Sequence, residues 1–262
     1  MHLNLHGKRA YVCGSTQGIG RAAAERLAAA GASITLIARN EDALQQVRTS
    51  LPTEAGQSHR HLVADFTDPS TLAERVPADL EAAGPVHILV NNTGGPPPGP
   101  AFEATADQYL DAFQQHLICN HLLATRVTPG MRDSGYGRII NVISTSVRQP
   151  IKGLGVSNTV RGAVASWAKT LAGELGPWGV TVNNVLPGFT ATARLDSIIA
   201  GKAKKADSDA QAIADQMKEE VPLRRFAEPE EVAAAVVFLA SPEAAYISGV
   251  SLPVDGGRLE CL

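Results

Sequence analysis

Near the start of the chain stands the stretch Cys13-Gly14-Ser15-Thr16-Gln17-Gly18-Ile19-Gly20, whose three glycines follow the spacing Gly-x-x-x-Gly-x-Gly. A short apolar run, residues 10–13, leads into it, and an alanine-rich run, residues 19–30, follows. A glycine turn between a strand and a helix lets the backbone approach a pyrophosphate closely and offers it the free N–H groups of the helix N-terminus. The stretch therefore predicts a dinucleotide-binding turn, with a purely structural turn as the alternative.

The rest of the chain repeats the alternation of strand and helix. Short apolar or β-branched runs predict strands at residues 10–13, 33–38, 61–64, 86–90, 138–143, 180–186 and 250–254. Amphipathic runs predict helices at residues 19–30, 43–51, 69–82, 106–131, 155–175 and 229–239. Strands joined by helices pair in parallel, so we expect one α/β domain over residues 1–262. It is a Rossmann-type, doubly wound, seven-stranded parallel sheet with helices on both faces and ligands beyond the strands' carboxyl ends.

Composition narrows the classes of function. Hydrophobic residues make up 44% of the 262 residues and charged ones 19%, as in an ordinary globular domain, and the net charge is −3. Without a basic block we expect no nucleic acid and no membrane surface as partner. The cysteines, Cys13, Cys119 and Cys261, form no CxxC pair, which argues against a zinc site or a disulfide framework. No apolar run has a signal core or spans a membrane, so we expect a cytoplasmic protein with small-molecule or subunit partners and no metal.

Two segments depart from the alternation. The run Gly94-Gly95-Pro96-Pro97-Pro98-Gly99-Pro100 follows the fourth strand, where it is interpreted either as a stiff wall of the ligand crevice or as a rigid surface loop. Residues 193–220, rich in Ala, Lys, Asp and Gln, follow the sixth strand at the same end of the sheet. We predict a mobile substrate lid there, with a solvated connector as the alternative.

The end of the second strand bears on the cofactor. It reads Leu36-Ile37-Ala38-Arg39-Asn40 and lacks the acidic residue that would accept a hydrogen bond from the ribose 2′-hydroxyl of NAD. Arginine pairs well with the 2′-phosphate of NADP, so Arg39 favours NADP, with NAD possible. The alternative is that Arg39 is an ordinary surface arginine.

Taken together, these motifs resemble the short-chain dehydrogenase/reductase superfamily, in particular its branch similar to 3-oxoacyl-(acyl-carrier-protein) reductases. Further matching motifs run in order along nearly the whole chain: Val63-Ala64-Asp65-Phe66, Asn91-Asn92-Thr93-Gly94, Gly137-Arg138-Ile139-Ile140-Asn141-Val142-Ile143-Ser144, Pro187-Gly188-Phe189-Thr190-Ala191-Thr192, Pro229-Glu230-Glu231-Val232-Ala233 and Val254-Asp255-Gly256-Gly257. So many matches in order indicate the fold strongly.

The resemblance implies roles for these residues. Asp65 would accept from the adenine amino group, Asn91 with Gly94 would line the adenosine ribose side of the cleft, and residues 187–192 would run along the nicotinamide carboxamide. The complete set of expected cofactor-binding residues is Gly14, Ser15, Gln17, Gly18, Ile19, Gly20, Arg39, Asp65, Asn91, Gly94, Arg161, Pro187, Gly188, Thr190 and Thr192. The resemblance also implies a homo-oligomer, a tetramer or a dimer, built through the helices at 106–131 and 155–175 and the carboxyl-terminal strand region.

The pattern departs from the superfamily at its proton-transfer pair. Relatives use a tyrosine four residues before a lysine, and none of the four tyrosines here has a lysine at that spacing. Counting from the family's serine position, Ser144, places Ser157 at the tyrosine and Arg161 at the lysine. A serine hydroxyl ionises far less readily than a phenol of pKa about 10, so Ser157 is a poor substitute at neutral pH. Arg161 keeps a positive charge that suits ribose hydroxyls.

One further position differs. The family's asparagine on the preceding long helix aligns with His116, and Asn120, one turn further on, is the alternative. An imidazole has an intrinsic pKa of about 6.5, which suits acid–base work, so His116 is a hypothetical proton carrier. A packing or capping role is the other interpretation.

Three functions follow from these observations. The first is an NADP(H)-dependent oxidoreductase of divergent mechanism acting on a carbonyl or alcohol, with Ser144, Ser157, Arg161 and His116 as its catalytic residues. The second is a catalytically impaired dinucleotide-binding protein, a sensor or a supporting subunit. The third is a non-redox enzyme, such as an isomerase, on the same scaffold.

Overall fold

The glycine-rich stretch joins the first strand to the first helix, as predicted. The computed structural model describes residues 3–261. In it β1 (Arg9–Cys13) leads through the turn into α1 (Gly18–Ala29). The sheet has the strand order β3-β2-β1-β4-β5-β6-β7, with every pair parallel. The order reverses beside β1, so a crevice opens at the carboxyl ends of β1 and β4.

The predicted strands all form, and so do the predicted crossover helices outside residues 106–131, with ends that differ by a few residues. The other strands are β2 (Ser33–Ala38), β3 (Arg60–Val63), β4 (Ile88–Asn91), β5 (Gly137–Val142), β6 (Val180–Pro187) and β7 (Ser251–Val254). The other crossover helices are α2 (Glu41–Ser50), α3 (Ser70–Ala83), α6 (Gly155–Leu175) and α9 (Pro229–Ala240). None of the helices within residues 3–261 combines the length and apolar character that crossing a bilayer requires.

The helix predicted over residues 106–131 is not one regular helix. It consists of α4 (Ala106–Phe113), a π-helical turn (Gln114–Ile118) and α5 (Cys119–Asp133). A π-turn makes i→i+5 bonds and is often found at functional sites, and this one contains His116. The uniform helical period assumed from the sequence is therefore wrong at this point.

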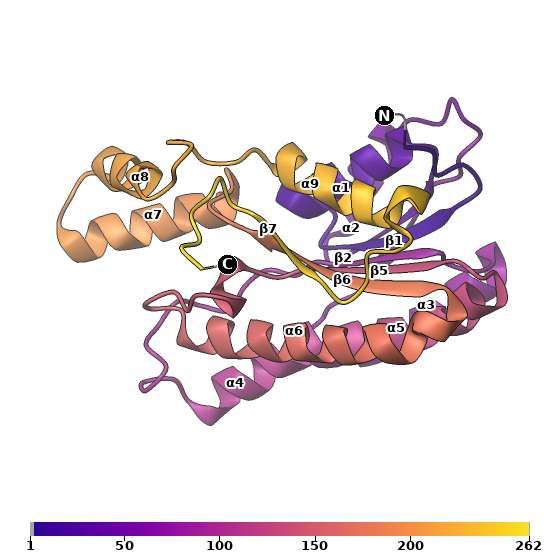
Figure 1. The fold of residues 1–262 in the computed structure, drawn as a ribbon, viewed down its shortest axis with the longest axis horizontal. Coiled ribbons are helices and arrows are strands. Elements are labelled where there is room, and N and C mark those ends of the chain that lie inside the picture. Colours follow the sequence, from indigo (N-terminus) through magenta and orange to yellow (C-terminus); the bar gives the residue numbers. More distant parts are fainter. Residues whose placement is uncertain (1–2, 262) are drawn as a thin grey trace.

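Helices cover both faces of the sheet (Figure 1). On one face α1, α2 and α9 pack through side chains such as Leu27, Leu44 and Val236 against alternate strand residues. On the other face α3, α5 and α6 pack through a second apolar cluster that includes Val76 and Leu123. Because side chains alternate along a strand, each of the strands β1 to β6 contributes to both clusters, which is the doubly wound arrangement that the sequence predicts.

Residues 193–220 form two helices, α7 (Ala193–Ala206) and α8 (Ala210–Glu219), which extend beyond the body of the sheet (Figure 1). They have a small apolar cluster of their own, in which Leu195, Ile199 and Met217 are buried. Backbone hydrogen bonds close the base of the unit, from the N–H of Ala191 to the carbonyl of Ala227 at 2.8 Å. The two helices agree with the composition of this segment, and its function as a substrate lid remains a prediction.

The proline-rich loop after β4 is tied to α6. The Gly99 N–H donates to the Gly153 carbonyl at 2.8 Å, and the Gly155 N–H donates to the Gly99 carbonyl at 2.9 Å. On the opposite side, Nη2 of Arg194 at the start of α7 donates to the Pro96 carbonyl at 2.6 Å. The loop therefore stands between α6 and α7 at the carboxyl end of the sheet.

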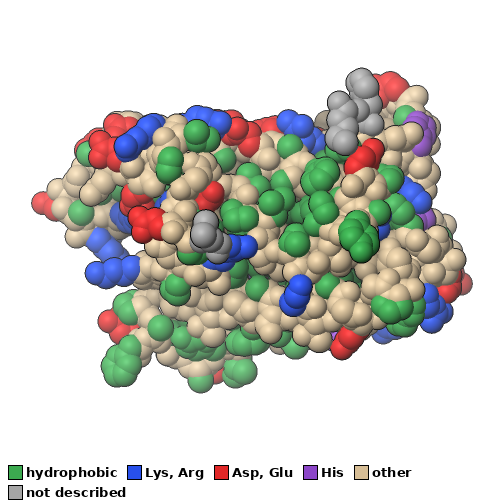
Figure 2. Space-filling view, in the orientation of Figure 1, with side chains coloured by type: hydrophobic (Ala, Val, Ile, Leu, Met, Phe, Trp, Pro, Cys, Tyr) green, Lys and Arg blue, Asp and Glu red, His purple; other side chains and the backbone are tan. Residues whose placement is uncertain are grey.

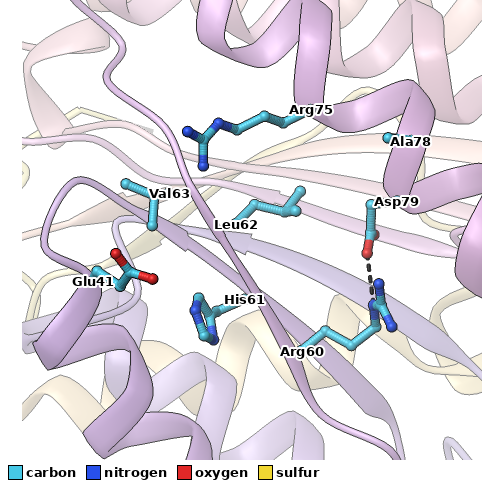
Figure 3. A pocket seen from close by; sticks show the side chains of 8 residues that line it. All are labelled: Glu41, Arg60, His61, Leu62, Val63, Arg75, Ala78 and Asp79. Carbon is cyan, nitrogen blue, oxygen red and sulfur yellow. Dashed lines mark hydrogen bonds and ion pairs between the residues drawn. The ribbon is translucent and has the colours of Figure 1, made fainter.

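A buried acid holds the other side of the molecule together. Asp79 on α3 accepts from the Tyr11 hydroxyl at 2.7 Å and from Nε of Arg60 at 2.7 Å, and it pairs with Arg9. Figure 3 shows the ion pair of Arg60 with Asp79 in the wall of a pocket of about 290 Å³ that the edge strand β3 lines together with α2 and α3. Three strands lie between β3 and β5, so this pocket is separate from the site residues at the carboxyl end of β5.

Candidate active site

The glycine turn has the geometry of a cradle. Gly14 has a φ of +58°, and a Cβ on it would lie 2.6 Å from the carbonyl oxygen of Asn92. A Cβ on Gly20 would overlap the carbonyl oxygen of Gly14, so that position requires glycine. The side-chain amide of Asn92 donates to the carbonyls of Cys13 and Gly14 at 3.3 and 3.4 Å. The turn is thus held open at the N-terminus of α1, where a pyrophosphate fits.

Most other residues expected to bind the cofactor surround this turn. Ser15 is buried against β2, Gln17 is the exposed residue before α1, and the Arg39 side chain is exposed where β2 ends. Asp65 follows β3, and its carboxylate accepts from the Thr67 N–H at 2.9 Å.

The segment after β6 also lies against the turn. A Cβ on Gly18 would be 3.1 Å from Cγ2 of Thr192, so residues 187–192 pass beside the cradle. Gly188 packs against Asp255, and Thr190 is buried.

The Asn91 side chain is buried within the sheet. It is 2% exposed, and its amide donates to Oδ1 of Asn141 at 2.9 Å, so the role of Asn91 at the cofactor cleft stays a prediction. Asn141 donates in turn to Asn184 at 3.0 Å, and Asn184 donates to the Ser251 hydroxyl at 3.1 Å. These four residues are register partners on β4, β5, β6 and β7, so they form an amide ladder across the sheet. Gly94, by contrast, is exposed at the crevice.

Arg161 occupies the centre of the candidate site. It is 8% exposed, and its Nη1 donates to the carbonyls of Val142 and Ile143 at 3.2 and 2.9 Å, where β5 ends. Burial lowers the pKa of the guanidinium to about 10, and the nearby charge of Arg194 adds to this effect. The side chain remains cationic at neutral pH. The positive charge is therefore fixed at the carboxyl end of β5.

The two serines flank this arginine. Ser144 follows β5, and its Oγ accepts from the Ser146 N–H at 3.1 Å, which fixes the short 3-10 turn at Thr145–Val147. Ser157 is 7% exposed and lies one turn before Arg161 on α6, so both side chains project from the same side of the helix. Counting along the sequence therefore located a group that the fold does bring together.

His116 is buried and uncharged. Its Nδ1 lies 2.6 Å from the Thr93 hydroxyl, and the side chain is 4% exposed. Burial, together with the charge of Arg161, lowers the pKa of the imidazole to about 3. Asn120, the alternative at this position, is buried on α5, and its Oδ1 has no hydrogen-bond partner within residues 3–261. Of these two residues only His116 titrates, and the charge of Arg161 lowers its pKa.

Sequence reasoning missed three supporting residues. Asn92 holds the glycine turn, Thr93 contacts His116, and Arg194 reaches the proline-rich loop. Asn92 and Thr93 belong to a motif that was recognised, but their partners are more than twenty positions away in sequence. Nothing in the local pattern marks Arg194. Within the described part of the chain, no group of three or more His, Cys, Asp or Glu side chains is arranged to hold a metal ion.

A doubly wound parallel sheet with a glycine cradle at its switch point defines a dinucleotide-binding protein of the Rossmann class. Residues 14–258 match the family described as enoyl-(acyl carrier protein) reductase. The 3-oxoacyl-(acyl-carrier-protein) reductase of Vibrio cholerae is 35% identical over 255 residues, which cover 97% of this chain and 98% of that protein.

Solved structures agree with this match. L-sorbose reductase from Gluconobacter frateurii, complexed with NADPH and L-sorbose, superimposes with a TM-score of 0.93 at 32% identity, covering 100% of both chains. The NADPH-dependent reductase YwfH of bacilysin biosynthesis gives a TM-score of 0.92 at 29% identity, covering 97% of this chain and 99% of that one. The chain therefore belongs to the short-chain dehydrogenase/reductase superfamily of oxidoreductases, within the family named above.

Proposed function

We propose that the protein is an NADP(H)-dependent oxidoreductase that acts on a carbonyl or alcohol substrate without the family's tyrosine–lysine pair. The observation that carries this proposal is the intact glycine cradle at β1 together with a buried cation, Arg161, at the end of β5. The exposed Arg39 at the end of β2 supports NADP over NAD, and both solved relatives described above use NADPH.

The residues around the cradle would hold the dinucleotide. The turn of residues 14–20 and the N-terminus of α1 would bind the pyrophosphate, and Arg39 would pair with the 2′-phosphate. Asp65 would accept from the adenine, and residues 187–192 would follow the nicotinamide carboxamide. When bound, the cofactor supplies or accepts the hydride.

Two side chains would act on the substrate oxygen. The Ser144 hydroxyl would donate a hydrogen bond to it, since this serine follows β5 at the edge of the crevice. Arg161 would stabilise negative charge that develops on this oxygen, or hold the nicotinamide ribose, with its free guanidinium nitrogens. Its Nη1 is already fixed by two backbone carbonyls, so the group is preorganised.

The proton would pass through a water molecule near Ser157. His116, the proton carrier suggested by the sequence, is disfavoured because an imidazole with a pKa of about 3 binds a proton poorly at neutral pH. We assign His116 a positioning role, in which its ring holds Thr93 beside the site. Direct proton transfer from the Ser157 hydroxyl is disfavoured by the high pKa of an aliphatic alcohol.

Binding and turnover measured together test this proposal. Calorimetry should show tighter binding of NADPH than of NADH. Turnover is measured by the absorbance change of NADPH oxidation with a series of saturated and α,β-unsaturated carbonyl compounds as substrates. We expect Ser144→Ala to lower kcat by about 100-fold, because a hydrogen bond to the developing oxyanion is lost. The exposed Ser197→Ala on α7 is the matched control and should leave kcat unchanged.

Each alternative has its own outcome. NADPH binding without turnover of any compound would favour the catalytically impaired dinucleotide-binding protein. The observation that supports this alternative is Ser157, which stands where the family has its tyrosine. Substrate conversion without a change in nicotinamide absorbance would favour a non-redox enzyme. If neither NADPH nor NADH binds, the proposal is wrong.

A further inference from the structure

Two arginines without an acidic partner meet beside the proline-rich loop. A Cβ placed on Gly95 would lie 3.5 Å from Nη2 of Arg161 and 3.4 Å from Nη2 of Arg194. Both distances start from one point, so the two guanidiniums are close neighbours although they come from α6 and α7. Within residues 3–261 neither takes part in an ion pair.

Such a pair is unfavourable by itself. Like charges at short range repel, and the repulsion is strongest where burial excludes water. Arg161 is 8% exposed, and the charge of Arg194 helps to lower the pKa of its guanidinium. A fold that keeps two such cations together without an acid gains stability when an anion binds between them.

The hydrogen bonds show which atoms remain for a ligand. Arg161 donates through Nη1 to the carbonyls of Val142 and Ile143, and no residue of the described chain accepts from its Nη2. Arg194 is anchored by a bond to the Pro96 carbonyl, yet its side chain is exposed to solvent. The buried Arg161 guanidinium thus forms the floor of the site, and the exposed Arg194 guanidinium forms its rim. A ligand entering from solvent reaches Arg194 first.

The phosphates of the dinucleotide have other partners. The pyrophosphate fits the glycine turn at residues 14–20, and the 2′-phosphate fits Arg39 after β2, three strands away from β5. The substrate oxygen is proposed to react near Ser144 and Ser157. Ser157 lies on α6 with Arg161, and Ser144 directly follows Ile143, whose carbonyl accepts a hydrogen bond from Arg161. The anion expected here therefore belongs to the substrate.

We infer that Arg161 and Arg194 bind a carboxylate on the substrate, so that the natural substrate is a carbonyl or α,β-unsaturated compound with an acidic group. This inference rests on the proposed function, because it concerns the same site. Guanidinium is planar and presents paired N–H donors, which match the two oxygens of a carboxylate. Arg194 is the specificity-determining residue, since Arg161 also serves the reacting oxygen or the ribose.

Matched pairs of acids and esters test the inference. The probes are benzoylformate, acetoacetate and 2-oxobutanoate, each compared with its methyl ester, with NADPH as reductant. We expect the ratio of kcat/KM for acid over ester to favour the acid in the unmodified protein. In Arg194→Ala this ratio should fall by about 10- to 100-fold, and Arg194→Lys should restore part of it. Lys202→Ala removes a charge from the same helix and should leave the ratio unchanged.

A second measurement separates this inference from the proposed function. Calorimetry of the NADP⁺-saturated protein should show binding of the acids, weak or no binding of the esters, and loss of acid binding in Arg194→Ala. That result without any turnover would contradict the oxidoreductase and still support the carboxylate site. Equal use of acid and ester together with no acid binding would overturn the inference. A second result would also overturn the inference: if Arg194→Ala lowers NADPH affinity by as large a factor as it lowers turnover of the acids, Arg194 binds the cofactor and not the substrate.

Discussion

His116 shows how the surroundings of one side chain change its chemistry. The imidazole lies 4% exposed beside Arg161, and burial followed by that charge lowers its pKa from about 6.5 to about 3. The folded protein therefore resists protonation of this residue, whereas the unfolded chain accepts the proton near pH 6.5. The stability that the neutral ring contributes is complete above pH 6.5 and is lost as the pH falls from there toward 3.

Replacing His116 should make the stability less dependent on pH. In His116→Gln the side chain can still contact Thr93 but does not titrate. The unmodified protein should lose about 2 kcal/mol of unfolding free energy between pH 7 and 5 through this residue, and the variant should not. Urea denaturation at both pH values measures the difference, with the exposed His121→Gln as control. An identical loss in all three proteins would show that His116 is protonated freely in the fold.

For single residues, the sequence predicted where the candidate site residues lie better than what each side chain does there. Counting from Ser144 reached Ser157 and Arg161, because all three residues lie within the single crossover unit that joins β5 to α6. It could not show that His116 is kept neutral, because this depends on burial and on the charge of Arg161, which lies on another element. Burial and contacts between distant residues are properties of the folded chain.

The glycine turn is the element whose geometry is most restricted. In Gly20→Ala the added methyl group would overlap the Gly14 carbonyl, and the turn would have to move away from Asn92. We expect NADPH affinity to fall by more than about 10-fold and stability by about 2 kcal/mol, from steric overlap in a packed turn. Isothermal titration and thermal denaturation measure these two effects.

The control for this variant is another glycine in a helix. Around Gly201, on α7, a Cβ would meet no atom within 4 Å. Gly201→Ala should therefore stabilise the protein by up to about 1 kcal/mol, because alanine favours the helix more than glycine does. Similar losses in Gly20→Ala and Gly201→Ala would contradict the steric explanation.

The amide ladder across the sheet should contribute to the stability of the protein. Asn141 is 1% exposed and is bonded on both sides, by accepting from Asn91 and donating to Asn184. Asn141→Ala would leave a buried donor and a buried acceptor without partners, at a cost of about 2–5 kcal/mol. Ser251→Ala, at the half-buried end of the ladder, should cost about 1 kcal/mol or less. Equal losses in chemical denaturation would show that the ladder does not act as a unit.

The π-turn between α4 and α5 marks the limit of prediction at the level of elements. Apolar residues at helical spacing predict helix across residues 106–131, and helix is what forms on either side of Gln114–Ile118. One wider turn changes which side chains face the sheet, but it leaves no signal in composition. That is why the sequence left His116 and Asn120 as alternatives.

The whole molecule is the scale at which the sequence was most informative. Alternation of strands and helices leaves few topologies, because crossovers are right-handed and sequential strands tend to be neighbours. The observed order, with β3 and β7 at the edges, is the one expected of a doubly wound sheet. What the alternation did not predict is the separate packing of α7 and α8 or the contact of Arg194 with the proline-rich loop.

The edge at β7 bears on assembly. Strand β7 has a neighbour only on the β6 side, and an edge strand presents unpaired N–H and C=O groups. Figure 2 shows hydrophobic side chains gathered on the face where β7 lies. Near this strand Tyr246 is fully exposed and Val250 is 37% exposed, while Leu110 on α4 is 66% exposed. Exposed apolar side chains gathered on one face are typical of a surface that another subunit covers.

We therefore expect a homo-oligomer of two or four copies, as the resemblance implies, and substitutions on these surfaces test it. Sedimentation equilibrium should give a mass of two or four chains for the unmodified protein. Tyr246→Glu, or Leu110→Glu on the helical surface, should lower that mass, because a buried unpaired charge is unfavourable in an interface. Neither side chain supports the fold of a single copy, so the circular dichroism of both variants should be unchanged. Gln45→Glu, on the exposed side of α2, should not alter the mass. A single-chain mass for the unmodified protein would rule out the oligomer, and unchanged masses in both variants would place its interface on another surface.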